Sequence, residues 1–178
     1  MLMDPFLQDY SFAVDLLGIS KDNSSVLDVG CGIYRLGEVF RRLDYSNIRH
    51  VGLDGNSLIN EDMRRKALGF RGNGDLVCAL GEEMPFSENS FDYVLCCGLP
   101  IYDTSRMRRI ASELVRVCKP RGRILVTQPC KRYKDNIYLP QLLEEFGLNK
   151  LFYASLHQSR REVNGPFVIE YEYHIFEK

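Results

Sequence analysis

The chain has 178 residues, 45% of them hydrophobic and 26% charged, and its formal net charge is −1. This length and composition suit one globular domain, so we expect residues 1–178 to form a single domain. The near-zero net charge excludes a general positive field, and we therefore expect no nucleic-acid partner.

The N-terminus and the cysteines indicate a protein of a reducing compartment. Residues 1–5 lack the basic start and the long apolar core of a signal peptide. No run approaches the roughly 18 apolar residues that a membrane helix needs. The six cysteines contain no Cys-x-x-Cys pair, so we predict neither a zinc nor a redox site. We expect a cytoplasmic protein without a membrane span or a metal.

The first part of the chain alternates helical and strand patterns. Apolar spacing predicts a helix that ends near Leu17, followed by a short buried strand at Ser25–Val29. A second helix is predicted over 36–43 and a second strand over 48–53. Residues 57–68 then form a third predicted helix, which Ser57 can cap and which Gly69 closes.

The same alternation continues through the middle of the chain. Apolar runs predict strands at 76–80, 91–97 and 124–127, and an amphipathic pattern predicts a helix over 107–117. A further helix is predicted over 139–146.

Two strands without a helix between them are predicted at the C-terminal end. They cover 151–156 and 167–176, with a loop at 158–166. In the last strand apolar and polar residues alternate, which suits an antiparallel strand with one wetter face.

These elements together predict an α/β fold. Five strands that alternate with helices imply a parallel sheet with right-handed crossovers. We therefore expect a Rossmann-like, doubly wound, mostly parallel seven-stranded sheet with an antiparallel final strand and helices on both faces. Such sheets bind ligands at the carboxyl ends of their strands, so the residues that follow each strand are the candidates for a site.

Two acidic residues and a glycine turn follow the first two predicted strands. Gly30 and Gly32 allow the backbone to approach a ligand closely, and Asp28 is placed to accept a hydrogen bond from a ligand ammonium. Asp54 can accept both hydroxyls of a ribose. The structural alternatives are a glycine turn that only joins strand to helix, and an Asp54 that only caps the next helix.

A nicotinamide cofactor is the first functional alternative. Its fingerprint requires a third glycine, and Arg35 stands at that position. A large side chain there would obstruct the close approach of helix and pyrophosphate. The sequence therefore favours a nucleoside ligand without a pyrophosphate.

From Ser25 to Gln128 the chain resembles the class I S-adenosylmethionine-dependent methyltransferases, and within them the small domains typified by the ubiquinone and menaquinone methylases. The motifs match in order and spacing. They are Val26-Leu-Asp-Val-Gly-Cys-Gly32, Val51–Asp54, Glu82–Phe86, Ser90–Leu95 and Glu113–Val126.

The resemblance implies a set of residues around S-adenosylmethionine. Gly30, Cys31 and Gly32 would line the methionine part, with Asp28 near its amino group. Further along the cofactor, Asp54 would hold the ribose and Gly55 its edge, Gly81 and Glu82 would lie at the adenine, and Cys96 and Cys97 would lie near the methyl group.

The chain departs from the family pattern at two positions near the cofactor. Tyr34 stands where the family usually has a glycine, so the loop must be less tight, or Tyr34 must fold over the ligand. Leu80 stands where the family often has an aspartate, so Gly81 or Glu82 must supply polarity to the adenine.

The reaction expected from the resemblance is a direct displacement, for which no single catalytic residue need be visible. Tyr102 and Asp103, after the fourth strand, are candidates to polarise a substrate, with an ordinary loop role as the stronger reading. The acceptor is either a small molecule or a macromolecule, and a second copy in a homodimer is one way to close the open site. A catalytically silent binding or partner subunit is the alternative function.

Overall fold

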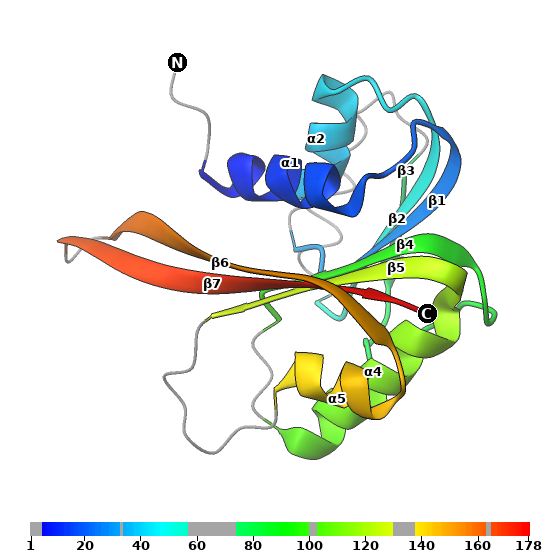
Figure 1. The fold of residues 1–178 in the computed structure, drawn as a ribbon. Coiled ribbons are helices and arrows are strands. Elements are labelled where there is room, and N and C mark those ends of the chain that lie inside the picture. The colour runs from blue at the N-terminus through cyan, green and yellow to red at the C-terminus, as the bar shows by residue number, and fades with distance from the viewer. Residues whose placement is uncertain (1–4, 33, 57–73, 100–102, 130–137, 163–164) are drawn as a thin grey trace.

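The computed structural model describes residues 5–32, 34–56, 74–99, 103–129, 138–162 and 165–178 (Figure 1). They form a seven-stranded sheet and helices on both of its faces. The strands are β1 Asp22–Val29, β2 Asn47–Asp54, β3 Gly74–Cys78, β4 Phe91–Cys97, β5 Cys118–Pro129, β6 Asn149–Glu162 and β7 Gly165–Glu177. The helices are α1 Pro5–Leu17, α2 Arg35–Arg42, α4 Thr104–Val117 and α5 Leu139–Glu145.

The strand order is β3-β2-β1-β4-β5-β7-β6, and β1 to β5 pair in parallel. β7 pairs antiparallel to both β5 and β6. This confirms the predicted doubly wound sheet with an antiparallel final strand. The strand order reverses between β1 and β4, which is where sheets of this kind bind their ligands.

Two hydrophobic layers hold the sheet between the helices. In Figure 1, α1 and α2 cover one face, and α4 and α5 cover the other. The alternation of side chains along each strand supplies both layers, because Val26 packs with α1 and α2 while its neighbour Leu27 packs with α4.

α4 shows why these segments are helical. Its apolar residues recur every three or four positions and are the ones that the structure buries: Met107, Ile110, Ala111, Leu114 and Val117. At its start, the Asp103 carboxylate accepts hydrogen bonds from the backbone N–H groups of Ser105 and Arg106. Asp103 therefore caps the helix. This structural role is in line with the preferred prediction that Asp103 is an ordinary loop residue.

The predicted helix over 57–68 lies outside the described residues, and so does Tyr102. Among the described residues, no helix is both long and apolar enough to cross a lipid bilayer.

The largest error of the sequence analysis concerns the two C-terminal strands. The loop expected over 158–166 was wrong, since β6 extends to Glu162 and β7 begins at Gly165. β7 pairs with β5 only from Tyr171 onward, and before that residue β6 and β7 pair only with each other. The two strands therefore continue as a ribbon beyond the carboxyl end of β5 (Figure 1).

Candidate functional site

The turn after β1 is held against the end of β2 by backbone hydrogen bonds. The N–H groups of Gly30 and Cys31 both donate to the carbonyl oxygen of Leu53, at 2.8 and 3.1 Å. Gly30 and Gly32 have φ angles of 74° and 50°, in the left-handed region that glycine adopts at little cost. The turn thus needs these glycines for its shape and lies at the carboxyl edge of the sheet.

Asp28 is a fully buried carboxylate at this edge. Neither of its two oxygens has a hydrogen-bond partner among the described residues. Burial raises the pKa of this carboxyl from 3.8 to about 7, the nearby Tyr10 hydroxyl partly offsets the rise, and the charge of Asp54 adds to it. Buried carboxylates are normally paired, so Asp28 is a candidate to accept a hydrogen bond from a ligand or to pair with a cation.

Asp54 lies at the end of β2 and holds the turn from the other side. Its carboxylate accepts hydrogen bonds from the N–H of Gly32 at 3.0 Å and from the N–H of Asn56 at 2.8 Å. An ionised carboxylate offers about four acceptor positions, and a carboxylate at the end of the second strand is the type of group that accepts the hydroxyls of a ribose. The loop-ordering role and the predicted ribose role of Asp54 are therefore compatible.

Of the two alternatives for Tyr34, the one in which it folds over the ligand does not fit the structure. Tyr34 adopts a left-handed conformation with φ 53° and ψ 50°, which is costly for a residue with a side chain. Its ring is 8% exposed, packs beside Cys31, and stacks on His50 with the ring centres 5.5 Å apart. Its hydroxyl forms a hydrogen bond with Nδ1 of His50. The ring therefore turns inward, and the other alternative, a changed loop, applies.

Three glycines make room for the Tyr34 ring. A methyl group on Gly37 of α2 or on Gly52 of β2 would come within 2.6 Å of ring carbons, and one on Gly74 of β3 within 2.8 Å of the hydroxyl oxygen. We call this space, between Gly37, Gly52 and Gly74, the tyrosine slot. Burial lowers the pKa of His50 to about 4, so the slot is closed by a neutral imidazole.

The end of β4 meets the glycine turn. The side chain of Leu99 lies directly over Gly30, where a methyl group would come within 2.8 Å of it. Cys96 and Cys97 point to opposite faces of the sheet: Cys96 is 1% exposed and packs on the α4 side, while Cys97 is half-buried on the side of α1 and α2. Of the two predicted cysteines, Cys97 therefore shares a face with Asp28.

The turn after β3 contains the residues predicted at the adenine. Leu80 is 55% exposed and lies against Gly55. Gly81 sits on the core, where a methyl group would lie 3.4 Å from both Val29 and Ile110. The carboxylate of Glu82 pairs with Arg106 of α4.

Two residues of this edge were missed by the sequence analysis as parts of a site. Neither Tyr10, in the first helix, nor Leu99, just after the fourth strand, was predicted as part of a site. Both reach the edge through contacts between segments far apart in the chain. The one local signal was that Tyr10 carries a polar hydroxyl on an apolar helix face.

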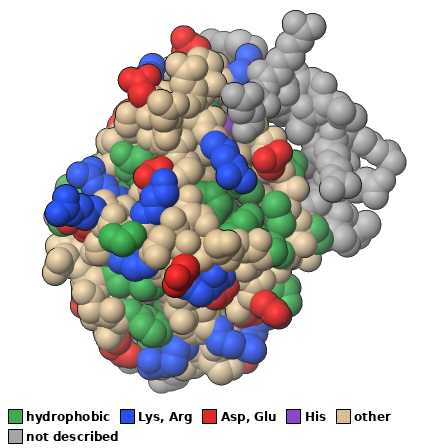
Figure 2. All heavy atoms as spheres, turned by 90° about the vertical axis from the view of Figure 1, so that its right-hand side faces the viewer, with side chains coloured by type: hydrophobic (Ala, Val, Ile, Leu, Met, Phe, Trp, Pro, Cys, Tyr) green, Lys and Arg blue, Asp and Glu red, His purple; other side chains and the backbone are tan. Residues whose placement is uncertain are grey.

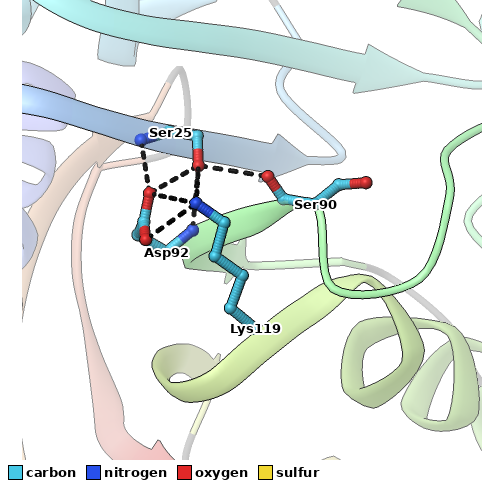
Figure 3. A network of polar contacts seen from close by, with 4 residues as sticks. All are labelled: Ser25, Ser90, Asp92 and Lys119. Atoms are coloured by element: carbon cyan, nitrogen blue, oxygen red, sulfur yellow. Dashed lines mark hydrogen bonds and ion pairs between the residues drawn. The ribbon is translucent and has the colours of Figure 1, made fainter.

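A second polar cluster lies at the opposite, amino edge of the sheet (Figure 3). The Asp92 carboxylate accepts hydrogen bonds from the backbone N–H of Ser25 at 2.9 Å and from its hydroxyl at 2.6 Å. The Lys119 ammonium lies 2.9 Å from both carboxylate oxygens. These partners lower the pKa of Asp92 despite partial burial. We call this set the amino-edge network, and its groups satisfy one another.

The surface around this edge carries both signs of charge. Figure 2 faces the right-hand side of Figure 1, where the parallel strands begin, and shows Lys and Arg side chains interspersed with Asp and Glu among the described residues. The amino edge is therefore a mixed surface with a satisfied network.

The carboxyl edge, in contrast, defines a class of protein. A doubly wound sheet with a glycine turn after β1 and an acidic residue after β2 belongs to the α/β domains that bind nucleoside cofactors.

A family model described as a methyltransferase domain matches residues 26–122, more than half of the chain. The chain belongs to this family of S-adenosylmethionine-dependent methyltransferases.

Comparison with curated proteins and solved structures agrees with this assignment. The chain is 32% identical over 142 residues to the ubiquinone/menaquinone biosynthesis C-methyltransferase of Haemophilus ducreyi, covering 79% of this chain and 53% of that protein. It is 33% identical over 126 residues to the protein of the same name in Azotobacter vinelandii, covering 66% and 46%. The chain thus spans about half the length of the curated relatives it matches.

Solved structures share the fold at low sequence identity. A methyltransferase structure from Bacillus halodurans matches with a TM-score of 0.77 at 15% identity, covering 96% of this chain and 99% of that one. Geranyl diphosphate C-methyltransferase from Streptomyces coelicolor, solved with S-adenosyl-L-homocysteine, matches with a TM-score of 0.76 at 16% identity, covering 96% and 79%.

The residues of the carboxyl edge fit the family's cofactor. S-Adenosylmethionine carries a sulfonium and an ammonium, and the unpartnered Asp28 carboxylate is a group that a cation would satisfy. The nearby charges of Asp28 and Asp54 also raise the pKa of the Cys31 thiol, after burial, so two of the described carboxyl groups act on this turn. Cofactor and site are therefore complementary in charge.

Proposed function

We propose that this chain binds S-adenosylmethionine at the carboxyl edge of its sheet and transfers the methyl group to an acceptor by direct displacement. The observation that carries the proposal is the fully buried carboxylate of Asp28, which has no hydrogen-bond partner among the described residues and lies beside two left-handed glycines. A binding edge kept in this form is costly to the empty protein and is compensated when a cationic ligand arrives.

In this proposal each part of the cofactor lies at the end of a different strand. Asp28, at the end of β1, accepts hydrogen bonds from the ammonium of the methionine part, and Gly30 and Gly32 let the backbone run close to it. Asp54, at the end of β2, accepts the ribose hydroxyls while it continues to hold the N–H of Gly32. The proposal therefore keeps the roles that the sequence predicted for Asp28, Gly30, Gly32 and Asp54.

The chemistry of the step comes from the cofactor, which carries an activated methyl group when bound. The chain's residues contribute position. The turn is fixed by Leu53, Asp54 and the tyrosine slot, so the backbone around Gly30 and Gly32 is ordered before the ligand arrives. Alignment of this kind supplies several kcal/mol of the barrier to a displacement reaction.

For the acceptor, we propose a nucleophilic carbon atom. The curated relatives are named as C-methyltransferases of ubiquinone and menaquinone biosynthesis, and one structural neighbour is named as a C-methyltransferase of geranyl diphosphate. Acceptors of the ubiquinone and menaquinone routes are therefore the first to offer, with a methyl-labelled cofactor. A carbon-bound methyl in the product supports this proposal, and transfer to oxygen or nitrogen alone contradicts it.

Isothermal titration with S-adenosyl-L-homocysteine and S-adenosylmethionine tests the binding step. We expect saturable binding to the wild-type chain and a loss of at least about tenfold in affinity for Asp54→Ala, since a bidentate contact to the ribose is removed. Asp92→Asn, which alters a carboxylate at the opposite edge, is the matched control and keeps the wild-type affinity.

The outcomes separate the competing functions. An absence of binding at millimolar ligand refutes the proposal. Binding with full affinity in Asp54→Ala refutes the assigned site. Binding without transfer to any offered acceptor favours a silent binding subunit over an enzyme.

A further inference from the structure

A half-exposed apolar side chain lies beside the residue that follows the proposed ribose-binding aspartate. Leu80 is 55% exposed, on the turn that follows β3. It lies against Gly55, where a methyl group would come within 3.0 Å of its Cδ2 atom. Gly55 directly follows Asp54, the carboxylate proposed to hold the ribose.

The strand order places the base on this turn. β2 lies between β1 and β3, and the carboxyl ends of β2 and β3 are joined through the pairing of Asp54 with Cys78 and the 3.2 Å hydrogen bond from the N–H of Ala79 to the Asp54 carbonyl. With the methionine part over β1 and the ribose over β2, the base extends to the end of β3. Leu80 is the large exposed side chain there.

Of the two glutamates on this turn, Glu82 and Glu83, the one nearer to Leu80 in sequence is engaged elsewhere. Among residues 79–82, Glu82 alone carries a carboxylate. That carboxylate pairs with the guanidinium of Arg106 on α4, and the Glu82 side chain is 9% exposed. Arg106 is in turn fixed at the first turn of α4, where its N–H donates to Asp103. Glu82 is therefore held toward the helix by a charged partner.

We propose that this chain recognises the base of its cofactor through apolar contact with Leu80, a position that carries no carboxylate to read the exocyclic amino group. The inference rests on the proposed function and adds to it the basis of nucleobase specificity. A site that hydrogen-bonds a ligand group rejects analogues that lack it, whereas an apolar surface discriminates weakly. The chain therefore tolerates cofactors changed at the six-position of the purine.

Competition between two nucleosides tests this inference without any acceptor. S-Adenosyl-L-homocysteine and S-inosyl-L-homocysteine differ in the amino group at the six-position, and both are titrated calorimetrically into the full chain. We expect the wild-type dissociation constants to agree within about threefold, because neither base loses a specific partner. A wild-type preference above about tenfold for the adenosine compound overturns the inference.

Variants at Leu80 sharpen the test. Leu80→Asp restores a carboxylate and is expected to create a preference of at least about tenfold for the adenosine compound. Leu80→Met, the matched apolar control, keeps both affinities close to wild type. Leu80 is exposed, so both variants are expected to fold, which thermal unfolding checks.

The remaining outcomes are also decisive. A Leu80→Asp protein that still binds both nucleosides equally overturns the placement of the base on Leu80. If neither nucleoside binds the wild-type chain, the proposed function itself is refuted. If the wild-type chain binds both but prefers one base, only the present inference is refuted.

Discussion

The two edges of the sheet each hold an aspartate at a strand terminus, and the structure treats them oppositely. Asp92, at the amino edge, accepts hydrogen bonds from Ser25 and Lys119, and its pKa is lowered. Asp28, at the carboxyl edge, is more deeply buried, has no partner for either oxygen among the described residues, and its pKa is raised to about 7.

This difference distinguishes a structural carboxylate from one that awaits a ligand. The amino-edge network (Figure 3) supplies its own counter-charge, so its carboxylate stabilises the fold without help. At the carboxyl edge the counter-charge must come from outside the described residues. A buried, unpaired charge lowers the free energy of unfolding, and a ligand that pairs with this charge raises it again.

The largest predicted effect concerns Asp28 and pH. Its folded-state pKa of about 7 lies above the ordinary value of 3.8, so the unfolded chain releases its proton first as pH rises. The wild-type protein therefore loses stability between about pH 4 and pH 7, by about 4 kcal/mol in total, relative to Asp28→Asn. Urea unfolding of both proteins without ligand, at intervals from pH 4.5 to pH 8, measures the difference.

The same pair of proteins should respond differently to ligand. S-Adenosyl-L-homocysteine is expected to stabilise the wild type at pH 8 and to stabilise Asp28→Asn much less, because an amide cannot neutralise the ammonium. A stability difference that does not change with pH would show that Asp28 titrates normally and would remove the contrast between the two edges.

A smaller effect is expected at the amino edge. Asp92→Asn removes a charged acceptor that is 35% exposed, and should cost about 1–2 kcal/mol of unfolding free energy near neutral pH. Because the pKa of Asp92 is lowered, this contribution is present above about pH 4 and is lost as pH falls through the folded-state value. Urea unfolding at pH 7 and pH 3 measures it.

The amino-edge variant also has a binding readout. Its affinity for S-adenosyl-L-homocysteine should equal that of the wild type, since the network lies at the far end of the strands. A tenfold loss of affinity in Asp92→Asn, at a temperature where the variant is folded, would mean that the two edges are coupled.

The smallest predicted effect lies in the tyrosine slot. Tyr34→Phe keeps the ring and leaves Nδ1 of His50 without its buried partner, at a cost of about 1 kcal/mol in unfolding free energy. Affinity for S-adenosyl-L-homocysteine should change by less than about twofold, because the hydroxyl faces away from the site. Thermal unfolding and titration of Tyr34→Phe decide this, and a large loss of affinity would place Tyr34 among the cofactor contacts.

The fold followed well from the sequence because its main signals are local. Buried runs such as Ser25–Val29 and the amphipathic pattern of α4 gave the elements, and their alternation gave the parallel sheet. The ribbon formed by β6 and β7 was not predicted from the sequence. Residues 158–166 contain charged residues, Gly165 and Pro166, which resemble a loop, whereas the two strands satisfy each other's backbone groups by pairing.

The candidate site was predictable in part, for a related reason. Asp28 and Asp54 were found because they lie at the carboxyl ends of strands, which fixes their place at the edge. The engagement of Glu82 by Arg106 and the inward turn of Tyr34 were not, since both depend on contacts with distant segments. Leu80 was recognised as a departure, and its exposure against Gly55 needed the structure.

The tyrosine slot limits which substitutions this sequence can accept during evolution. Tyr34 fits because Gly37, Gly52 and Gly74 lack side chains, and any side chain at one of them would collide with the ring or its hydroxyl. A substitution at one of the three glycines therefore requires that the tyrosine be replaced first, and Gly52 and Gly74 are also constrained by Cys31 and His50 respectively. Among relatives that share the tyrosine, we therefore expect glycine at the positions of Gly37, Gly52 and Gly74. Relatives that lack the tyrosine are expected to vary at these positions.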